Sequence, residues 1–226
     1  MTLLAIDTAA NLCAACLSDA ETGAILGAEV LDIGKGHAEQ LMDVIAQAMA
    51  EAGAQWPDLT RLAVTVGPGS FTGIRVGVAA ARGLALALDL PLTGITTLEA
   101  LAAETRAAQP DRPVLAALDA RRGEVYAQVF GTSGEAEGPP VAMKVADAAA
   151  RVRSGMALCG SAAAMVAEMS GEAGLAFGPR AAAPDIAVVA ALAAARPPTQ
   201  EKPKPLYLRA ADARPQEGFA LPRRPA

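Results

Sequence analysis

The segment LLAIDTAANLCAACLSDAETGAILGAEVL, residues 3–31, contains three short apolar runs separated by turn residues. The runs cover Leu3 to Asp7, Leu12 to Ser18 and Ala24 to Leu31, with Asn11 and Gly23 between them. Runs of this length bounded by Asn and Gly are typical of β-strands joined by tight turns. The segment is therefore predicted to form a three-stranded β-meander.

The next elements alternate between helix and strand. His37 to Ala52 is predicted to be a helix, because apolar residues recur at helical spacing and Gly53 follows as a stop signal. These apolar residues are Leu41, Val44, Ile45, Ala48 and Met49. Further strands are predicted at Arg61 to Val66 and Pro91 to Ile95, and further helices at Phe71 to Leu88 and Thr97 to Arg106.

This order, three strands followed by helix, strand, helix and strand, is that of the ribonuclease-H-like unit of actin-like and hexokinase-like ATPases. A second unit begins after Gln109-Pro110-Asp111, with a hairpin around Arg121-Arg122-Gly123. Its strands are predicted at Pro113 to Asp119, Glu124 to Phe130 and Met156 to Cys159, with a loop at 131–140. Its helices are predicted at Val145 to Arg153, Ser161 to Met169 and Pro184 to Ala195. We expect an α/β protein with two lobes, the second degenerate: residues 1–108, residues 109–208, and a disordered basic tail at 209–226, with a strand at Leu206 to Arg209.

The chain has a net charge of −5, which argues against strong binding of nucleic acid by the isolated protein. The charge is uneven, because from Arg196 onward seven Lys or Arg residues face three acids. This basic end is interpreted either as a solvated tail or as an arm that touches tRNA.

No secretion signal is recognised at the start, and the apolar run near residues 76–92 contains Arg82 and Asp89. The run is therefore read as a buried helix, with no membrane contact and a cytoplasmic location. Cys13 and Cys16 form a CxxC pattern, but side chains three apart on a strand point to opposite faces. We expect structural cysteines.

Several segments resemble one known family. GPGSFTGIRVG (67–77) and DARRGEVY (119–126) look like signatures of the TsaB (YeaZ) family, and the first also occurs in its larger paralogue TsaD. LAIDT (4–8) and PLYLR (205–209) fit the family's beginning and ending. The resemblance implies a non-catalytic subunit that binds and activates TsaD, which transfers threonylcarbamoyl to N6 of adenosine 37 in tRNA. It also implies a TsaE-type ATPase as third partner, tRNA contact through the complex, and a homodimer when alone.

The residues argue against independent catalysis. TsaD proteins hold a metal with a His-x-x-x-His pair, and here His37 is the chain's one histidine and Leu41 stands in the second place. We therefore expect no metal and no peptidase chemistry. Actin-like ATPases use a glycine-rich first turn under the phosphates, whereas Asp7 and Thr8 are followed by Ala9-Ala10-Asn11. We expect no cofactor of its own, with ATP or ADP left open at the junction with TsaD. The alternative function is an actin-like ATPase using Asp7 and Asp119.

Two surfaces are candidates for contacts. Gly73, Gly77, Ala81 and Ala85 form a stripe of small residues, which either packs on the protein's own sheet or meets another subunit. The family pairs with TsaD, or with itself, through its first two helices. The predicted partner-binding residues are His37, Leu41, Val44, Phe71, Gly73, Ile74, Gly77, Val78, Ala81 and Arg82. The candidates for nucleotide, tRNA or partner contact are Asp7, Thr8, Asp119, Arg121 and Arg122, although the hairpin with its two arginines is also interpreted as a solvated turn.

Overall fold

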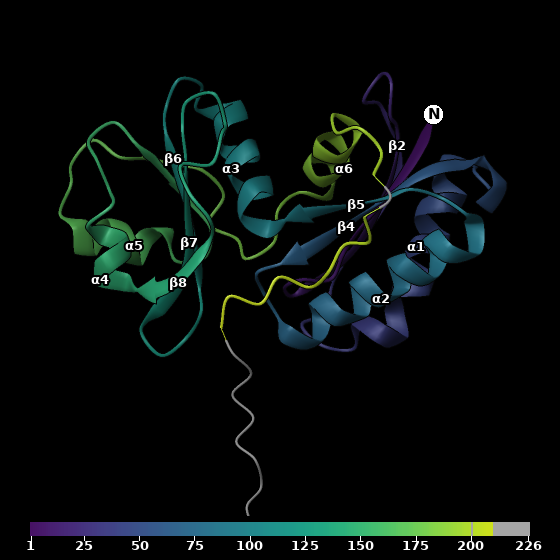
Figure 1. The fold of residues 1–226 in the computed structure, drawn as a ribbon, viewed down its shortest axis with the longest axis horizontal. Coiled ribbons are helices and arrows are strands. Elements are labelled where there is room, and N and C mark those ends of the chain that lie inside the picture. The colour runs from purple at the N-terminus through teal and green to yellow at the C-terminus, as the bar shows by residue number, and fades with distance from the viewer. Residues whose placement is uncertain (200, 210–226) are drawn as a thin grey trace, which may run out of the picture.

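The structure is a computed structural model that describes residues 1–199 and 201–209. It contains two five-stranded sheets that lie side by side as two lobes (Figure 1). The first sheet has the order β3-β2-β1-β4-β5 and the second has the order β10-β9-β6-β7-β8. The predicted basic tail at 209–226 lies outside the described residues, apart from Arg209.

The first lobe follows the predicted order closely. Its strands are β1 (Thr2–Asp7), β2 (Leu12–Asp19), β3 (Ile25–Asp32), β4 (Leu59–Gly67) and β5 (Leu92–Thr96). The meander pairs antiparallel, and β1, β4 and β5 pair in parallel. Its helices are α1 (His37–Ala52) and α2 (Phe71–Leu88), with a short 3-10 turn at Trp56–Asp58. Gly53 ends α1 in the left-handed conformation, and Ser70 caps the start of α2 by accepting a hydrogen bond from the backbone of Gly73.

The second lobe repeats the same series with shorter elements. Its strands are β6 (Val114–Asp119), β7 (Glu124–Phe130), β8 (Val141–Lys144), β9 (Ala157–Cys159) and β10 (Ala176–Phe177). Its helices are α4 (Val145–Ala149) and α5 (Ala163–Ser170). The short strands β8 and β10 were not predicted, because four and two residues are too few to produce a visible period. The predicted strand at Leu206 to Arg209 is absent, although Leu206 donates one backbone hydrogen bond to Val66.

The last helix of each unit packs on the sheet of the other lobe. α3 (Thr97–Ala108) follows β5 in sequence, yet its Leu98 and Leu101 pack with Val114 and Ala116 of the second sheet. α6 (Ile186–Ala194) follows β10, yet its Val189 packs on the first sheet (Figure 1). A division at residue 108 therefore separates the two sheets but not the helices that cover them.

Both faces of the first sheet are buried. Alternate residues of β1 and β2 enter different clusters: Cys13 packs toward α1 and α2, and Cys16 packs toward α6. Sheets covered on both faces have nearly continuous apolar strands. The expectation of structural cysteines is confirmed, because Cys13, Cys16 and Cys159 are free and buried. Burial raises the pKa of the thiols of Cys13 and Cys16 to about 11 and that of Cys159 to about 12.

Candidate functional site

The small-residue stripe of α2 faces the protein's own sheet. Gly73, Gly77 and Ala81 are buried. A Cβ atom on Gly73 would lie 2.0 Å from the carbonyl oxygen of Thr8, and one on Gly77 would lie 2.4 Å from the Thr8 hydroxyl. The Thr8 hydroxyl also donates a 2.7 Å hydrogen bond to the carbonyl of Gly73. The glycines are needed because α2 crosses the end of β1 at backbone contact distance.

Most residues predicted to bind a partner are therefore on the wrong face. Ile74 and Val78 of α2 are buried, as are His37, Leu41 and Val44 of α1. They form the core of the first lobe and cannot reach another subunit while the lobe is folded. Phe71 and Arg82 remain exposed as predicted. The error has a simple cause: small residues occur on both faces of α2, and the stripe of glycines and alanines was interpreted as a contact with another subunit although the exposed face is the one that carries Arg75 and Arg82.

The exposed face of α2 is a second stripe on the opposite side. It runs through residues spaced by three or four along the helix, namely Phe71, Arg75, Ala79, Arg82 and Leu86. The side chain of Leu86 is 76% exposed and that of Phe71 is 46% exposed. Nothing lies within 4 Å of a Cβ placed on Gly83. We call these residues, with Gly83 and Ala87, the outer face of α2. Met42 is the exposed large apolar residue of the neighbouring α1.

α2 is also long and apolar enough to cross a membrane by length and composition, the only such helix among the described residues. Only 28% of it is buried. Its two ends are attached to β4 and β5, which pair in parallel in one sheet, and its inner face packs on that sheet. A helix held in this way covers a sheet. Its apolar residues lie partly on the inner face, which packs on the sheet, and partly on the exposed outer face.

A cleft of about 480 Å³ lies between the two lobes. The first lobe contributes residues from its first turn and from the loop before α2, and the second lobe contributes the end of β6 and its hairpin. The lining residues are Ala9, Ala10, Asn11, Gly34, Gly69, Ser70, Leu118, Asp119, Ala120, Arg121, Tyr126, Ser161 and Ala182. Of the five residues predicted to contact nucleotide or RNA, Asp119 and Arg121 line this cleft.

Asp7 and Thr8 lie beneath the cleft and do not line it. Asp7 is 1% exposed, and its Oδ1 accepts a 2.8 Å hydrogen bond from the backbone of Ala9. Burial raises the pKa of the Asp7 carboxyl to about 6. The backbone N–H of Ser70 donates to the carbonyl of Ala9 at 2.6 Å, so the loop before α2 fills the space against the first turn. This closely packed turn lacks the bare backbone that would be needed to cradle phosphates.

The hairpin between β6 and β7 has an unusual backbone. Arg121 and Arg122 both have positive φ angles, 65° and 56°, and Gly123 continues the series at 75°. For a residue with a side chain the left-handed conformation costs roughly 1–2 kcal/mol. Turns of this kind usually contain Asn or Gly. The Arg121 side chain is 87% exposed, and its guanidinium lies 3.9 Å from a carboxylate oxygen of Asp119.

The C-terminal segment, residues 203–209, connects the outer face of α2 to this hairpin. The Tyr207 hydroxyl accepts a 2.7 Å hydrogen bond from Nε of Arg75. The rings of Phe71 and Tyr207 have centroids 5.2 Å apart. Two residues later, Arg209 donates to the carbonyl of Ala120 and forms an ion pair with Glu124 of the second lobe. Tyr207, Arg209 and Glu124 were not predicted as functional residues, although all three lie in the segments that carry the family resemblance.

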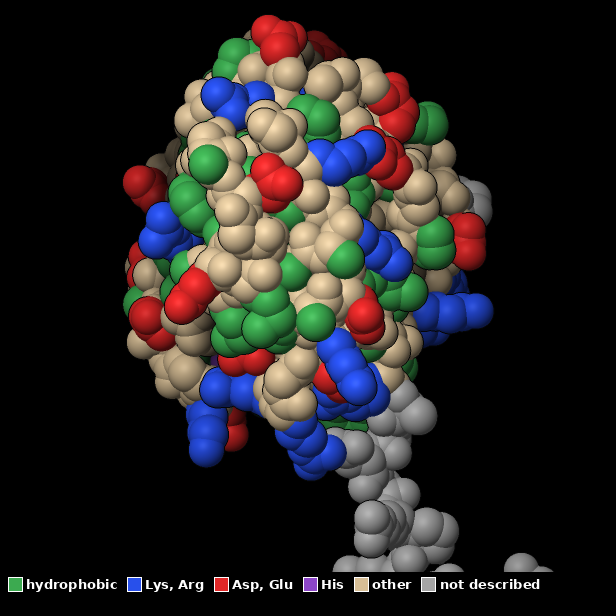
Figure 2. Space-filling model, turned by 90° about the vertical axis from the view of Figure 1, so that its left-hand side faces the viewer, with side chains coloured by type: hydrophobic (Ala, Val, Ile, Leu, Met, Phe, Trp, Pro, Cys, Tyr) green, Lys and Arg blue, Asp and Glu red, His purple; other side chains and the backbone are tan. Residues whose placement is uncertain are grey.

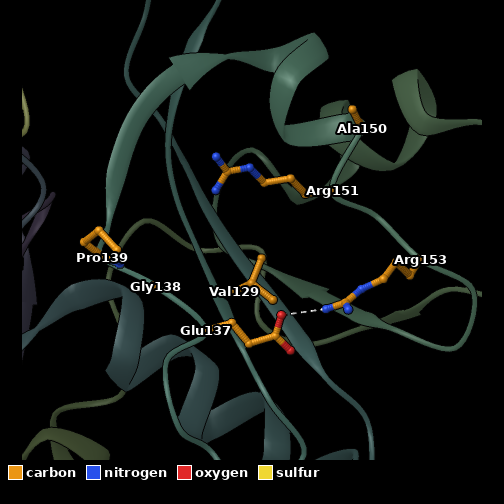
Figure 3. A pocket seen from close by; sticks show the side chains of 7 residues that line it. All are labelled: Val129, Glu137, Gly138, Pro139, Ala150, Arg151 and Arg153. Atoms are coloured by element: carbon orange, nitrogen blue, oxygen red, sulfur yellow. Dashed lines mark hydrogen bonds and ion pairs between the residues drawn. The ribbon is translucent and has the colours of Figure 1, made fainter.

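A smaller cavity, of about 290 Å³, lies on the second lobe (Figure 3). Its floor is Val129, and Arg151 extends across it from the end of α4. Arg153 forms a 2.8 Å ion pair with Glu137 at its edge. Among the residues that the structure describes, no group of three or more His, Cys, Asp or Glu side chains is placed to hold a metal ion.

The duplicated order of elements, with the cleft between two lobes, defines an α/β protein of the actin-like, ribonuclease-H-like class. Comparison with solved structures agrees. A YeaZ-like protein from Pseudomonas aeruginosa superposes with a TM-score of 0.78 at 26% identity, covering 92% of this chain and 99% of that one. The ethanolamine utilization protein EutJ from Carboxydothermus hydrogenoformans has a TM-score of 0.50 at 12% identity over 86% of this chain and 89% of its own, and shows the fold alone.

Sequence comparison identifies the family. The family model described as TsaD, tRNA N6-adenosine threonylcarbamoyltransferase, matches residues 32–202. The tRNA threonylcarbamoyladenosine biosynthesis protein TsaB of Escherichia coli is 37% identical over 56% of this chain, and that of Bacillus subtilis is 34% identical over 58%. The alignments span 53% and 55% of those relatives, a little over half their length. The chain belongs to the TsaD family and, within it, to the TsaB (YeaZ) group, which confirms the resemblance.

Proposed function

We propose that this protein is a non-catalytic subunit that binds a TsaD protein through the outer faces of α1 and α2. In this role it activates TsaD for transfer of a threonylcarbamoyl group to N6 of adenosine 37 in tRNA. The observation that carries the proposal is the outer face of α2, an 18-residue helix of which 28% is buried. Exposed apolar surface on a helix that is already fixed from inside is typical of a protein–protein interface.

The outer face has the composition of a helix-to-helix contact. Gly83 and the alanines beside it allow another helix to approach closely, and Leu86 can insert between the side chains of a partner. The position of the contact on α1 and α2 is the one that the family resemblance implied. The residues that make it differ from those predicted, because only the face turned away from the sheet is available.

The chemistry of the chain supports a non-catalytic role. The whole sequence contains one histidine, His37, and this side chain is buried at the start of α1. Its Nε2 atom has no hydrogen-bond partner within the described residues. Asp7, the acid that ends β1, is buried and lies outside the cleft. A buried histidine and a buried acid are poorly placed to serve as the base that activates a nucleophile in the cleft.

Analytical ultracentrifugation of the protein mixed with TsaD from the same cell tests the proposal. We expect a one-to-one species that forms while any homodimer peak shrinks, because both assemblies use the same face. We place the complex in the cytoplasm, with a TsaE-type ATPase as third partner, tRNA bound through the complex, and ATP or ADP, if present, at the junction with TsaD. Two unchanged peaks in the presence of tRNA, nucleotide and TsaE would reject the scaffold role.

One observation favours a second candidate, an actin-like ATPase acting alone. The interlobe cleft has room for a small ligand and is lined by Asp119 and Arg121. Calorimetric titration of the purified chain with ATP and magnesium discriminates between the two. We expect no heat of binding, because the loop before α2 packs against the first turn at Ala9. Measurable binding that Asp119→Asn abolishes would favour the ATPase.

A further inference from the structure

The C-terminal segment builds one surface out of the two lobes. In Figure 1 it runs in front of β4 and descends to the second lobe. Its contacts on the first lobe begin at Pro203, beside Gly94, and continue at Leu206, whose backbone N–H donates to the carbonyl of Val66 at 2.8 Å. Tyr207 then meets Arg75 and Phe71 at the start of α2.

The same segment holds the hairpin of the second lobe. Arg209 binds the carbonyl of Ala120 and the carboxylate of Glu124, so it contacts both sides of the turn formed by Arg121 and Arg122. Tyr207 and Arg209 are two residues apart, at most about 7 Å along the chain. The hairpin is therefore fixed close to the aromatic pair of Phe71 and Tyr207, at the mouth of the interlobe cleft that Ser70 and Arg121 line from opposite sides. We call the residues Phe71, Arg75, Tyr207, Arg121 and Arg122 the bridge surface.

The bridge surface combines two features that are rare in this protein. The chain has seven aromatic residues, and two of them, Phe71 and Tyr207, are nearly half exposed and adjacent to each other. The guanidinium of Arg75 lies 3.6 Å from the centroid of the Phe71 ring. Arg75 therefore lies against one side of the Phe71 ring, and exposed aromatic and guanidinium groups of this kind suit contact with another planar group.

The charge of the bridge surface is opposite to that of the whole protein. The surface contains three arginines, Arg75, Arg121 and Arg122, beside the acid Asp119, while Arg209 pairs with Glu124; the complete chain has a net charge of −5. Figure 2 shows that Lys and Arg side chains gather at the lower edge of the second lobe, the level at which the C-terminal segment ends in Figure 1. Two of these arginines, Arg121 and Arg122, are exposed and have left-handed backbone conformations (φ 65° and 56°) that are uncommon for residues with a side chain.

We propose that the bridge surface binds single-stranded RNA, with bases on the aromatic pair and phosphates on the hairpin arginines. Arginine side chains alone would suit an acidic protein partner as well as a nucleic acid. Arginines beside exposed aromatic rings are the combination that binds unpaired nucleotides, since every base has a face that can stack on a ring. Tyr207 already covers the start of α2, which leaves the rest of the outer face, from Ala79 to Ala87, for the protein partner. The choice of RNA as the nucleic acid rests on the proposed function; the surface itself does not.

Fluorescence anisotropy of the full chain with a short RNA stem that carries an unpaired loop tests the proposal. We expect weak binding at low salt, and weaker binding of a fully paired RNA of the same length. Replacing both hairpin arginines, Arg121→Gln with Arg122→Gln, should weaken binding about tenfold. It should also lower the slope of log affinity against log salt by about 1.4, since each phosphate contact to a single strand contributes about 0.7.

The matched control removes two arginines from the other cavity of the second lobe, Arg151→Gln with Arg153→Gln (Figure 3). It has the same change of charge and should leave the affinity and the salt slope nearly unchanged. Tyr207→Leu should lose at least fivefold on the looped RNA and little on the paired RNA, while Tyr207→Phe, which keeps the ring, should retain most of the binding. Circular dichroism and urea unfolding of each variant confirm that it is folded.

Three results would overturn the inference: no binding of the looped RNA by the unaltered chain, equal losses in the two arginine pairs, or no preference for unpaired RNA. A fourth would reassign the surface to a protein, namely a hairpin variant that weakens assembly with TsaD in the ultracentrifuge while RNA affinity is unchanged. Failure of the RNA measurement with normal assembly leaves the scaffold role intact. Failure of assembly with normal RNA binding rejects the scaffold role instead.

Discussion

The two lobes have the same order of elements but very different helices. α1 and α2 of the first lobe have 16 and 18 residues, whereas their counterparts α4 and α5 have 5 and 8. At 1.5 Å per residue, α2 is about 27 Å long and α5 about 12 Å. The short helices cover little more than their own sheet. The long helices also have an exposed outer face, which the packing of the lobe does not require.

The equivalent acids at the ends of the first strands also differ between the two lobes, in burial and in access to the cleft. Asp7 ends β1 and Asp119 ends β6. Asp7 is buried under a turn that the loop before α2 holds closed, whereas Asp119 lines the cleft and lies near Arg121. The first lobe thus keeps its acid buried beneath the cleft, whereas the second lobe places its acid in the cleft beside the hairpin.

The largest effect is expected inside the first lobe, where α2 touches β1. Gly73→Ala should lower the free energy of unfolding by about 3 kcal/mol, because the new Cβ would lie 2.0 Å from a backbone oxygen of Thr8. Gly83→Ala is the matched control on the outer face, where nothing lies within 4 Å of the new Cβ. It should raise stability by up to about 1 kcal/mol, since alanine favours helix over glycine. Urea unfolding measures both, and equal effects would mean that the two faces have been assigned wrongly.

An effect of up to about the same size on the free energy of unfolding is expected to distinguish Asp7 from Asp119. The pKa of Asp7 is about 6 in the folded protein and 3.8 in a water-exposed chain, so the folded state binds the proton more tightly. The stability that this carboxyl contributes is full below about pH 4 and is lost as the pH rises through 6. The two-unit difference corresponds to about 3 kcal/mol as an upper value.

Asp7→Asn should therefore flatten the dependence of stability on pH between 4 and 7 and should make the protein more stable at pH 7. The amide oxygen can still accept the hydrogen bond from Ala9. Asp119→Asn is the control in the second lobe, where the side chain reaches water. Urea unfolding at several pH values measures the difference, and a pH profile that Asp7→Asn leaves unaltered would contradict the burial of this carboxyl.

A charged residue on the outer face of α2 is expected to have an intermediate effect, and the effect is on association with a partner. Leu86→Asp should weaken pairing with TsaD, and any homodimer, at least tenfold, or about 1.4 kcal/mol. Stability should fall by about 1 kcal/mol, because aspartate forms helix less readily than leucine and its charge lies in the last turn, where the helix dipole disfavours it. Met165→Asp on α5 is the control, since Met165 is an exposed apolar residue of the counterpart helix. Sedimentation titrations measure both variants; equal losses would make the two lobes alike as binding surfaces.

The smallest effect concerns the segment that joins the lobes. Arg209→Gln removes a partly exposed ion pair with Glu124 and should cost about 1 kcal/mol. We expect faster hydrogen exchange in β6 and β7 near the hairpin, with β1 and β4 unchanged. Arg153→Gln, which breaks the more exposed pair with Glu137, should have less effect. Exchange that accelerates equally in both lobes would show that the segment stabilises the whole protein and not the hairpin in particular.

The sequence by itself determined the order of the elements, because the periods of 2 and 3.6 are strong in long segments such as β2, α1 and α2. It determined that Cys13 and Cys16 face different sides of a strand. It also determined that no histidine pair exists in the chain, which follows from counting. It was weakest where elements are only two to five residues long, as in β8, β10 and α4, since a period cannot be read from so few residues.

Only the tertiary structure decided which side of α2 is outside. Helical spacing groups Gly73 with Gly77 and Ala81, and Arg75 with Arg82; the two arginines favour an exposed face, but a stripe of small residues can pack either on the protein's own sheet or on another subunit. The contact of Gly73 and Gly77 with Thr8, distant in sequence, fixed the orientation. Tertiary contacts also exchanged α3 and α6 between the sheets and brought Arg209 to Glu124. Thr8 and Gly73 are 65 positions apart and Arg209 and Glu124 are 85 positions apart, and local sequence carries no record of which distant partner completes a surface.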